Sequence, residues 1–101
     1  MKFISFAMFD VAKAAEVAQA GDKVANTPGN KIIGQYICQG KAFDGVPPNT
    51  VVVIAIHETE SNEAITTGQY AHALAGATMW AVPVLEMPVA GAAATEKKYK
   101  K

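Results

Sequence analysis

Thr50–Glu58 reads T-V-V-V-I-A-I-H-E and is the longest unbroken β-branched run in the chain. A short apolar run of this kind, bounded by polar residues, is typical of a strand that is covered on both faces. Side chains alternate along a strand, so Val52, Ile54 and Ile56 share a bulky face. The smaller face ends at His57, one of two histidines. The stretch therefore predicts the centre of a sheet.

Composition limits the class of protein. The chain has 101 residues, of which 50% are hydrophobic and 18% charged, enough for one domain with its own core. Nine basic residues balance nine acidic ones, so no net field favours nucleic acid or an anionic membrane. The single cysteine, Cys38, excludes an internal disulfide and fits a reducing, cytoplasmic location. No apolar stretch reaches the roughly 20 residues that span a bilayer.

Before the central run, the pattern predicts a strand, a helix and a second strand. Lys2–Phe9 is apolar on both alternating faces, and Asp10 is a suitable helix N-cap. Val11–Ala25 has small apolar residues at helical spacing, and the turn Thr27–Asn30 (T-P-G-N) ends that helix. The glutamines and glycines of Lys31–Gly40 indicate an edge strand.

After the central run, a second helix and a fourth strand are predicted. Ser61 can cap a helix over Asn62–Leu74. Met79–Met87 has strand alternation, and Pro83 within it cannot donate to a ladder, so this strand belongs at an edge. Residues 89–101 have no strand periodicity and are expected to form a flexible Ala/Lys-rich tail after a domain of residues 1–88.

This order of elements predicts an α+β fold. Strand, helix, strand, strand, helix, strand is the ferredoxin-like βαββαβ arrangement, a four-stranded antiparallel sheet with two helices on one face. The bulky face is expected beneath the helices; it comprises Ile4, Phe6, Met8, Val52, Ile54 and Ile56. The smaller face, with Phe3, Ala7, Phe9, Val51, Val53 and Ala55, would stay uncovered. An open apolar face of that size predicts a homodimer.

Three stretches carry a resemblance to a known group of proteins. They are M-K-F-I-S-F at 1–6, K-I-I-G-Q-Y at 31–36 and W-A-V-P-V-L-E at 80–86. Over about residues 1–87 the chain resembles short uncharacterised domains of the dimeric α/β-barrel superfamily of ferredoxin-like proteins. Relatives there include cofactor-independent monooxygenases, lactone isomerases, haem proteins and members without known activity. The resemblance therefore implies a dimeric barrel and no particular reaction.

The two histidines are the candidate catalytic residues. The chain has no nucleotide-binding, nucleophile-elbow or zinc motif. His57 and His72 could each carry a proton. The alternatives are a strand-end histidine bonded to a neighbouring loop for His57, and a core histidine satisfied by a backbone carbonyl for His72. No ligand spacing joins them to an acid such as Glu58, so no metal and no cofactor are expected.

Four further residues are candidates for ligand binding, namely Tyr36, Cys38, Tyr70 and Trp80. The resemblance implies that a small ligand can lie between the sheet and the helices. The Gly- and Ala-rich helices either leave room for such a pocket or simply permit close packing. Cys38 has no basic neighbour in sequence, so a reactive thiol is not expected.

Two functional hypotheses follow. The first is a homodimeric α/β-barrel protein that binds a small molecule or serves as an accessory subunit, with no specific activity deducible. The alternative is a cofactor-independent monooxygenase or isomerase acting on a small aromatic or lactone substrate. RNA binding on the sheet is disfavoured, because Val51–Ile56 offers no aromatic side chain for stacking. The lysines of the tail are expected to form a solvated terminus.

Overall fold

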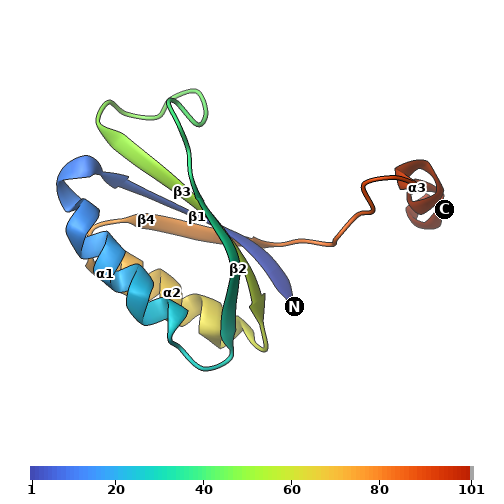
Figure 1. Cartoon of the computed structure of the whole chain (residues 1–101), viewed down its shortest axis with the longest axis horizontal. Coiled ribbons are helices and arrows are strands. Elements are labelled where there is room, and N and C mark those ends of the chain that lie inside the picture. Colours follow the sequence, from blue (N-terminus) through green and yellow to red (C-terminus); the bar gives the residue numbers. More distant parts are fainter. Residues whose placement is uncertain (101) are drawn as a thin grey trace.

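The computed structural model describes residues 1–100 and has the predicted ferredoxin-like architecture. A four-stranded antiparallel sheet has the order β2-β3-β1-β4, and α1 and α2 cover one of its faces (Figure 1). The elements are β1 (Lys2–Asp10), a 3-10 turn η1 (Val11–Lys13), α1 (Ala14–Ala25), β2 (Asn30–Ile37), β3 (Thr50–Thr59), α2 (Asn62–Leu74), β4 (Thr78–Pro83) and α3 (Ala92–Tyr99). The two most apolar strands, β1 and β3, are central, and the strands with Gly and Pro are the edges, as predicted.

The helix boundaries follow from local chemistry. The Asp10 carboxylate accepts a hydrogen bond from the Ala12 amide at 2.8 Å, so it caps the first helical segment. The Ser61 hydroxyl accepts from the Ala64 amide at 3.4 Å and caps α2. Gly76 follows α2 with a φ of 100°, a conformation that glycine adopts without strain. The two side-chain caps confirm the predicted helix starts, and Gly76 ends α2.

The edge strand β2 contains a bulge that simple alternation does not predict. Its register against β3 shifts between Ile32 and Gly34. Ile33 is the extra residue and is 53% exposed. Because of that shift, Gln35 and Ile32 lie on the same face of the sheet, opposite Ala55 and His57 respectively. Strict alternation would place Ile32 and Gln35 on opposite faces.

The prediction of which sheet face the helices cover is wrong. The side chains beneath α1 and α2 are those of the smaller face, which we call the helix face; they include Phe3, Ser5, Ala7, Phe9, Val53, Ala55 and His57. The helices themselves bury mainly alanine, glycine and valine. A Cβ on Gly68 would lie only 3.2 Å from Cγ1 of Val24, so α1 and α2 pack closely. Because many of the sheet residues beneath them are also small, α1 and α2 pack close to the sheet.

The bulky side chains therefore form the face without helices, which we call the open face. It carries Ile4, Phe6, Met8, Val52, Ile54, Ile56, Trp80 and Val82. Phe6 and Trp80 stack there with ring centroids 5.2 Å apart. In the part of the chain that the structure describes, no helix lies over these residues (Figure 1).

The C-terminal part differs from the predicted strand and tail. β4 ends at Pro83, four residues before the predicted end at Met87. The chain then leaves the sheet, and α3 stands apart from the rest of the molecule (Figure 1). Thus the segment expected as a tail contains a helix, none of whose residues is buried. Lys101 lies outside the described residues. No helix within residues 1–100 is long and apolar enough to cross a membrane.

Candidate functional site

His57 is the centre of a buried polar chain on the helix face. It lies near the end of β3 and is only 3% exposed. Its Nε2 is 2.7 Å from Oγ of Ser5, which comes from the neighbouring strand β1. Its Nδ1 is 3.0 Å from Oδ1 of Asn30, which begins β2 on the other side. Three adjacent strands thus contribute one hydroxyl, one imidazole and one carboxamide.

The partners of Asn30 determine where the protons lie. Nδ2 of Asn30 donates to the backbone carbonyl of Val24 at 3.3 Å, so its Oδ1 must face His57 and accept. Nδ1 of His57 therefore carries the ring proton, and Nε2 accepts from the Ser5 hydroxyl. With His57 neutral, the polar side-chain atoms of Ser5, His57 and Asn30 each have a hydrogen-bond partner. Burial, followed by the nearby His72, lowers the pKa of His57 below its usual value.

His72 lies on α2 and faces the same interior. Its Nδ1 is 2.8 Å from the Gly68 carbonyl, and a carbonyl only accepts, so Nδ1 carries a proton. In the neutral ring Nε2 is then a free acceptor. It lies 3.9 Å from the position that a Cβ on Gly21 of α1 would occupy. His72 is thus held by backbone, as the alternative in the sequence predicted, yet its second nitrogen points into the space between the helices.

Two adjoining cavities lie between the sheet and the helices. The outer cavity has a volume of about 220 Å³ and the inner one about 30 Å³. Both are bordered by Ala7, Gly21, Gln35, Val53 and His72. The inner cavity reaches Ser5 and His57, whereas the outer one runs along the small residues of α1 towards Asp22. The outer space is slightly below the range of typical ligand pockets, and the inner one has room for a water molecule or two.

The lining of the cavities is mostly apolar and contains no lysine or arginine. The polar groups of the outer cavity are Gln35, His72 and Asp22; the inner cavity adds Ser5 and His57. Such walls hold an apolar ring and offer it a few hydrogen-bonding groups. An anionic ligand would meet the Asp22 carboxylate without a compensating cation.

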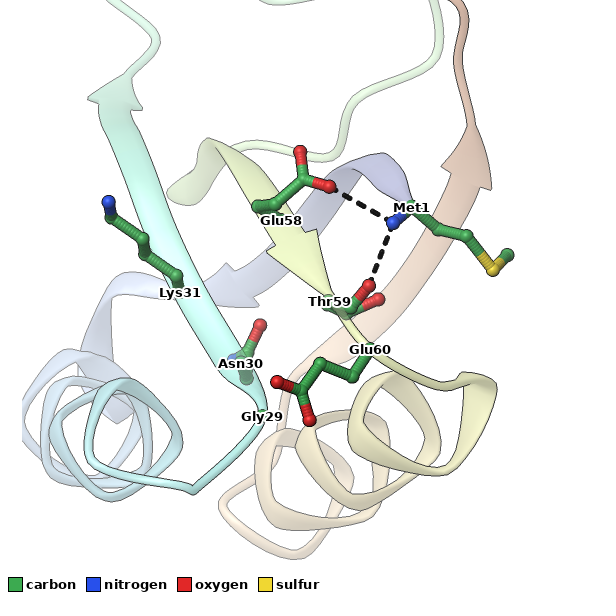
Figure 2. Close-up of a pocket in the computed structure, with 7 residues that line it drawn as sticks. All are labelled: Met1, Gly29, Asn30, Lys31, Glu58, Thr59 and Glu60. Carbon is green, nitrogen blue, oxygen red and sulfur yellow. Dashed lines mark hydrogen bonds and ion pairs between the residues drawn. The ribbon is translucent and has the colours of Figure 1, made fainter.

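A second, wider hollow lies where β2 begins and β3 ends (Figure 2). The Met1 ammonium there donates to the Glu58 carboxylate at 3.0 Å and to the Thr59 carbonyl at 2.8 Å. The carboxylates of Glu58 and Glu60 lie on different sides of the hollow and do not converge (Figure 2). Among residues 1–100, no three His, Cys, Asp or Glu side chains are grouped to hold a metal ion. The end hollow is therefore the weaker candidate site.

The structure brings together only part of the predicted site. His57 and His72 both border the inner cavity. Trp80 belongs to the open face, and Tyr36 lies opposite Ile54 on that same face. Tyr70 is 68% exposed on α2. Cys38 follows β2 and borders a surface hollow with the loop before β3 and the first residues of β3.

Sequence reasoning missed Ser5, Asn30 and Gln35 as members of the site. Ser5 is apolar-flanked and isolated in sequence, and Asn30 reads as part of a turn. A signal was available for Ser5, because antiparallel pairing of β1 with β3 places it diagonal to His57. Gln35 reaches the helix face only because of the bulge in β2.

Comparison with solved structures supports the fold. SnoaB, a cofactor-independent oxygenase from Streptomyces nogalater, superposes with a TM-score of 0.50 and 15% identity, covering 88% of this chain and 99% of that one. The fold is ferredoxin-like. A dinuclear metal binding peptidase of the M20 family, YXEP of Bacillus subtilis, matches with a TM-score of 0.42 and 12% identity over 80% of this chain and 24% of its own. No protein-family profile matches the sequence, and no curated protein does.

Proposed function

We propose that this protein binds a small, uncharged, largely apolar molecule in the outer cavity between the sheet and α1. The observation that carries the proposal is the combination of that 220 Å³ space with the free Nε2 of His72 at its inner end. Alanine and glycine on α1 leave this space, since larger residues there would fill it. A single ring with one or two substituents matches its size.

The residues that line the outer cavity also favour a particular chemical class of ligand. In the neutral ring, His72 Nε2 accepts a hydrogen bond, so it favours a ligand that presents a hydroxyl or N–H group. Asp22 is the one ionisable acid in the lining, and no lysine borders it there. A phenol or other cyclic alcohol therefore fits better than a carboxylate or a phosphate of the same size.

Ligand binding can be tested with simple probes. Phenol and cyclohexanol are titrated against the full chain by NMR, with benzoate as the anionic counterpart. Small fragments of this size are expected to bind with a Kd in the range of about 1 mM. Gly21→Leu should abolish binding by filling the outer cavity, whereas Gln19→Leu on the exposed side of the same helix should not. Equal binding to both variants, or no binding of any neutral probe, would refute the proposal.

We further propose that two copies pair through the open face. The observation that supports this is the bulky apolar surface that α1 and α2 leave uncovered, which includes the Phe6–Trp80 stack. Four strands of this length present on the order of 500 Å², as large as the largest apolar patch on most monomers. A twofold dimer would bury that face of both copies. Sedimentation at micromolar concentration should give twice the mass of the chain, and a monomer there contradicts the proposal.

The second candidate function is a cofactor-independent oxygenase or isomerase. It is favoured by one observation, two histidines that border one cavity, with His57 fixed by Ser5 and Asn30. A phenolic or enolic O–H bonded to His72 would pass its proton to Nε2, so that the imidazolium lies beside the new anion. SnoaB is a cofactor-independent oxygenase, and its likeness to this chain is one of fold. Turnover of a phenolic substrate that is lost in His72→Asn would support this function; binding without turnover would favour the first.

A further inference from the structure

Ser5 is a buried nucleophilic side chain that ligand binding alone does not use. It lies in the middle of β1 and is only 5% exposed. Its hydroxyl donates at 2.7 Å to Nε2 of His57, a nitrogen that can take the proton completely, which a backbone carbonyl cannot. A serine beside such a base is the arrangement that activates a hydroxyl for attack on a carbonyl carbon. The contact therefore has a chemical capacity beyond holding two strands together.

Asn30 supplies the third part of this arrangement. Its Oδ1 lies 3.0 Å from Nδ1 of His57, and its Nδ2 donates to the Val24 carbonyl at 3.3 Å, so the amide cannot turn over without losing both bonds. The ring proton is thereby held on Nδ1, and the lone pair of Nε2 is directed at Ser5. A nucleophile, a base and a group that orients the base recur with these roles in acyl-transfer enzymes of unrelated folds.

The two cavities give a substrate access to Ser5. The inner cavity, of about 30 Å³, borders Ser5 and His57, and it adjoins the outer cavity of about 220 Å³. Only a short acyl group such as acetyl fits the inner space, since that space holds about one or two water molecules. The ring of an aryl ester then lies in the outer cavity, at the site proposed for a phenol. The shape of the space thus matches an aryl ester of a short carboxylic acid.

We propose that this chain accepts a short acyl group from a small aryl ester on Oγ of Ser5 and then hydrolyses it. The inference rests on the proposed phenol site, because the leaving group occupies the outer cavity. Oγ attacks the carbonyl carbon while Nε2 of His57 takes the hydroxyl proton. The bond from that carbon to the phenol oxygen breaks, and the imidazolium gives its proton to the departing oxygen. Water then attacks the acyl group, with His57 again as base, so a carboxylic acid leaves and the serine is restored.

Two further residues narrow the class of substrate. Gln35 borders both cavities, so its Nε2 hydrogens can donate to the oxyanion that forms between them. His72 offers its free Nε2 to the O–H group of the released phenol. One carboxamide stabilises an oxyanion less than a full set of donors does, so the ester needs a good leaving group. Phenolic esters supply it, whereas amides and alkyl esters do not.

The parent chain tests the proposal directly, because Ser5 and Ser61 are its only two serines. The full-length protein is treated with methanesulfonyl fluoride, a reagent small enough for the inner cavity that leaves a stable sulfonyl ester on an activated serine. Peptide mass spectrometry then locates the modification. Ser5 should be modified and the exposed Ser61 should not. Modification of both serines at equal rates, or of neither, would overturn the proposal.

Release of para-nitrophenol from para-nitrophenyl acetate measures the reaction itself. Ser5→Ala and His57→Gln should each lower the rate by about 100-fold or more. Asn30 is a positioning residue, so Asn30→Asp, which keeps an acceptor for Nδ1 of His57, should retain most of the rate that Asn30→Leu loses. Ser61→Ala is the matched control and should equal the parent. Circular dichroism identifies the folded variants, and a folded Ser5→Ala with the parent's rate would contradict the mechanism.

The remaining outcomes separate this inference from the proposed binding site. Binding of phenol by NMR without modification of Ser5 and without release of nitrophenol would overturn the acyl transfer and leave the binding site standing. Modification of Ser5 by methanesulfonyl fluoride without phenol binding and without nitrophenol release would overturn the aryl ester as substrate together with the proposed phenol site. Modification, phenol binding and release that depends on Ser5 would support both.

Discussion

The buried His57 makes a sharp prediction about stability and pH. Burial, with His72 nearby, lowers the pKa of His57 in the folded chain, while in the unfolded chain the ring has its ordinary value near 6.5. Above that value neither state binds the proton and the folded state keeps its full stability. As the pH falls below 6.5, the unfolded chain takes up a proton that the folded chain refuses. Stability must therefore decrease towards acid, down to the folded pKa.

The difference of one bound proton between the folded and unfolded states limits the size of the effect. One proton difference gives a slope of at most about 1.4 kcal/mol per pH unit. A proton on Nε2 would also clash with the Ser5 hydroxyl proton, which must then rotate away from its 2.7 Å contact. Between pH 6.5 and pH 5.5 the free energy of unfolding should thus fall through His57 alone, by at most about 1 kcal/mol.

Urea unfolding of the parent chain and of His57→Gln at several pH values isolates this contribution. The variant should be less stable at pH 7.5. The difference between the two proteins should shrink as the pH decreases, because only the parent loses stability through protonation of His57 in its unfolded state. His72→Gln serves as a comparison, as it keeps the chain from Ser5 through His57 to Asn30. A difference between parent and His57→Gln that is constant from pH 7.5 to 5.5 would refute the assignment of a neutral, buried His57.

Three other substitutions test other parts of the structure. Ser5→Ala leaves Nε2 of His57 buried without a donor, so the free energy of unfolding in urea should decrease by about 1–3 kcal/mol. An unchanged urea midpoint would mean that water replaces the hydroxyl. Gly68→Val places side-chain atoms against Val24, whose Cγ1 would be 3.2 Å from the new Cβ. The free energy of unfolding should decrease by about 1–3 kcal/mol in the same assay. An unchanged value would mean that the helices separate freely. Ile54→Lys puts a charge in the middle of the open face, so sedimentation should show a monomer that keeps the circular dichroism of the parent, and an intact dimer would place the interface elsewhere.

Much of the fold can be predicted from local sequence. Asp10 and Ser61 mark helix starts because their side chains cap free amides, and Gly76 marks a stop because it tolerates a positive φ. Pro83 keeps β4 at an edge because it lacks an N–H group. These are properties of single residues and their neighbours, so they need no tertiary information.

The site was only half predictable. His57 and His72 are rare polar residues in apolar elements, so the sequence alone indicates both as candidate site residues. Ser5 and Asn30, the partners of His57, are ordinary residues in sequence, and only the register of three strands brings them to it. The bulge at Ile33 then decides that Gln35 borders the cavity.

By itself, the sequence determined the order of the elements, the central strands and the edges, because these depend on periodicity and on Gly and Pro. Only the tertiary structure decided which face of Thr50–Thr59 lies beneath the helices. Both faces are apolar, so hydrophobicity does not distinguish them. The choice depends on fit, since α1 and α2 carry small residues and approach closely over Val53 and Ala55. The bulky Ile54 and Ile56 are thereby left on the open face.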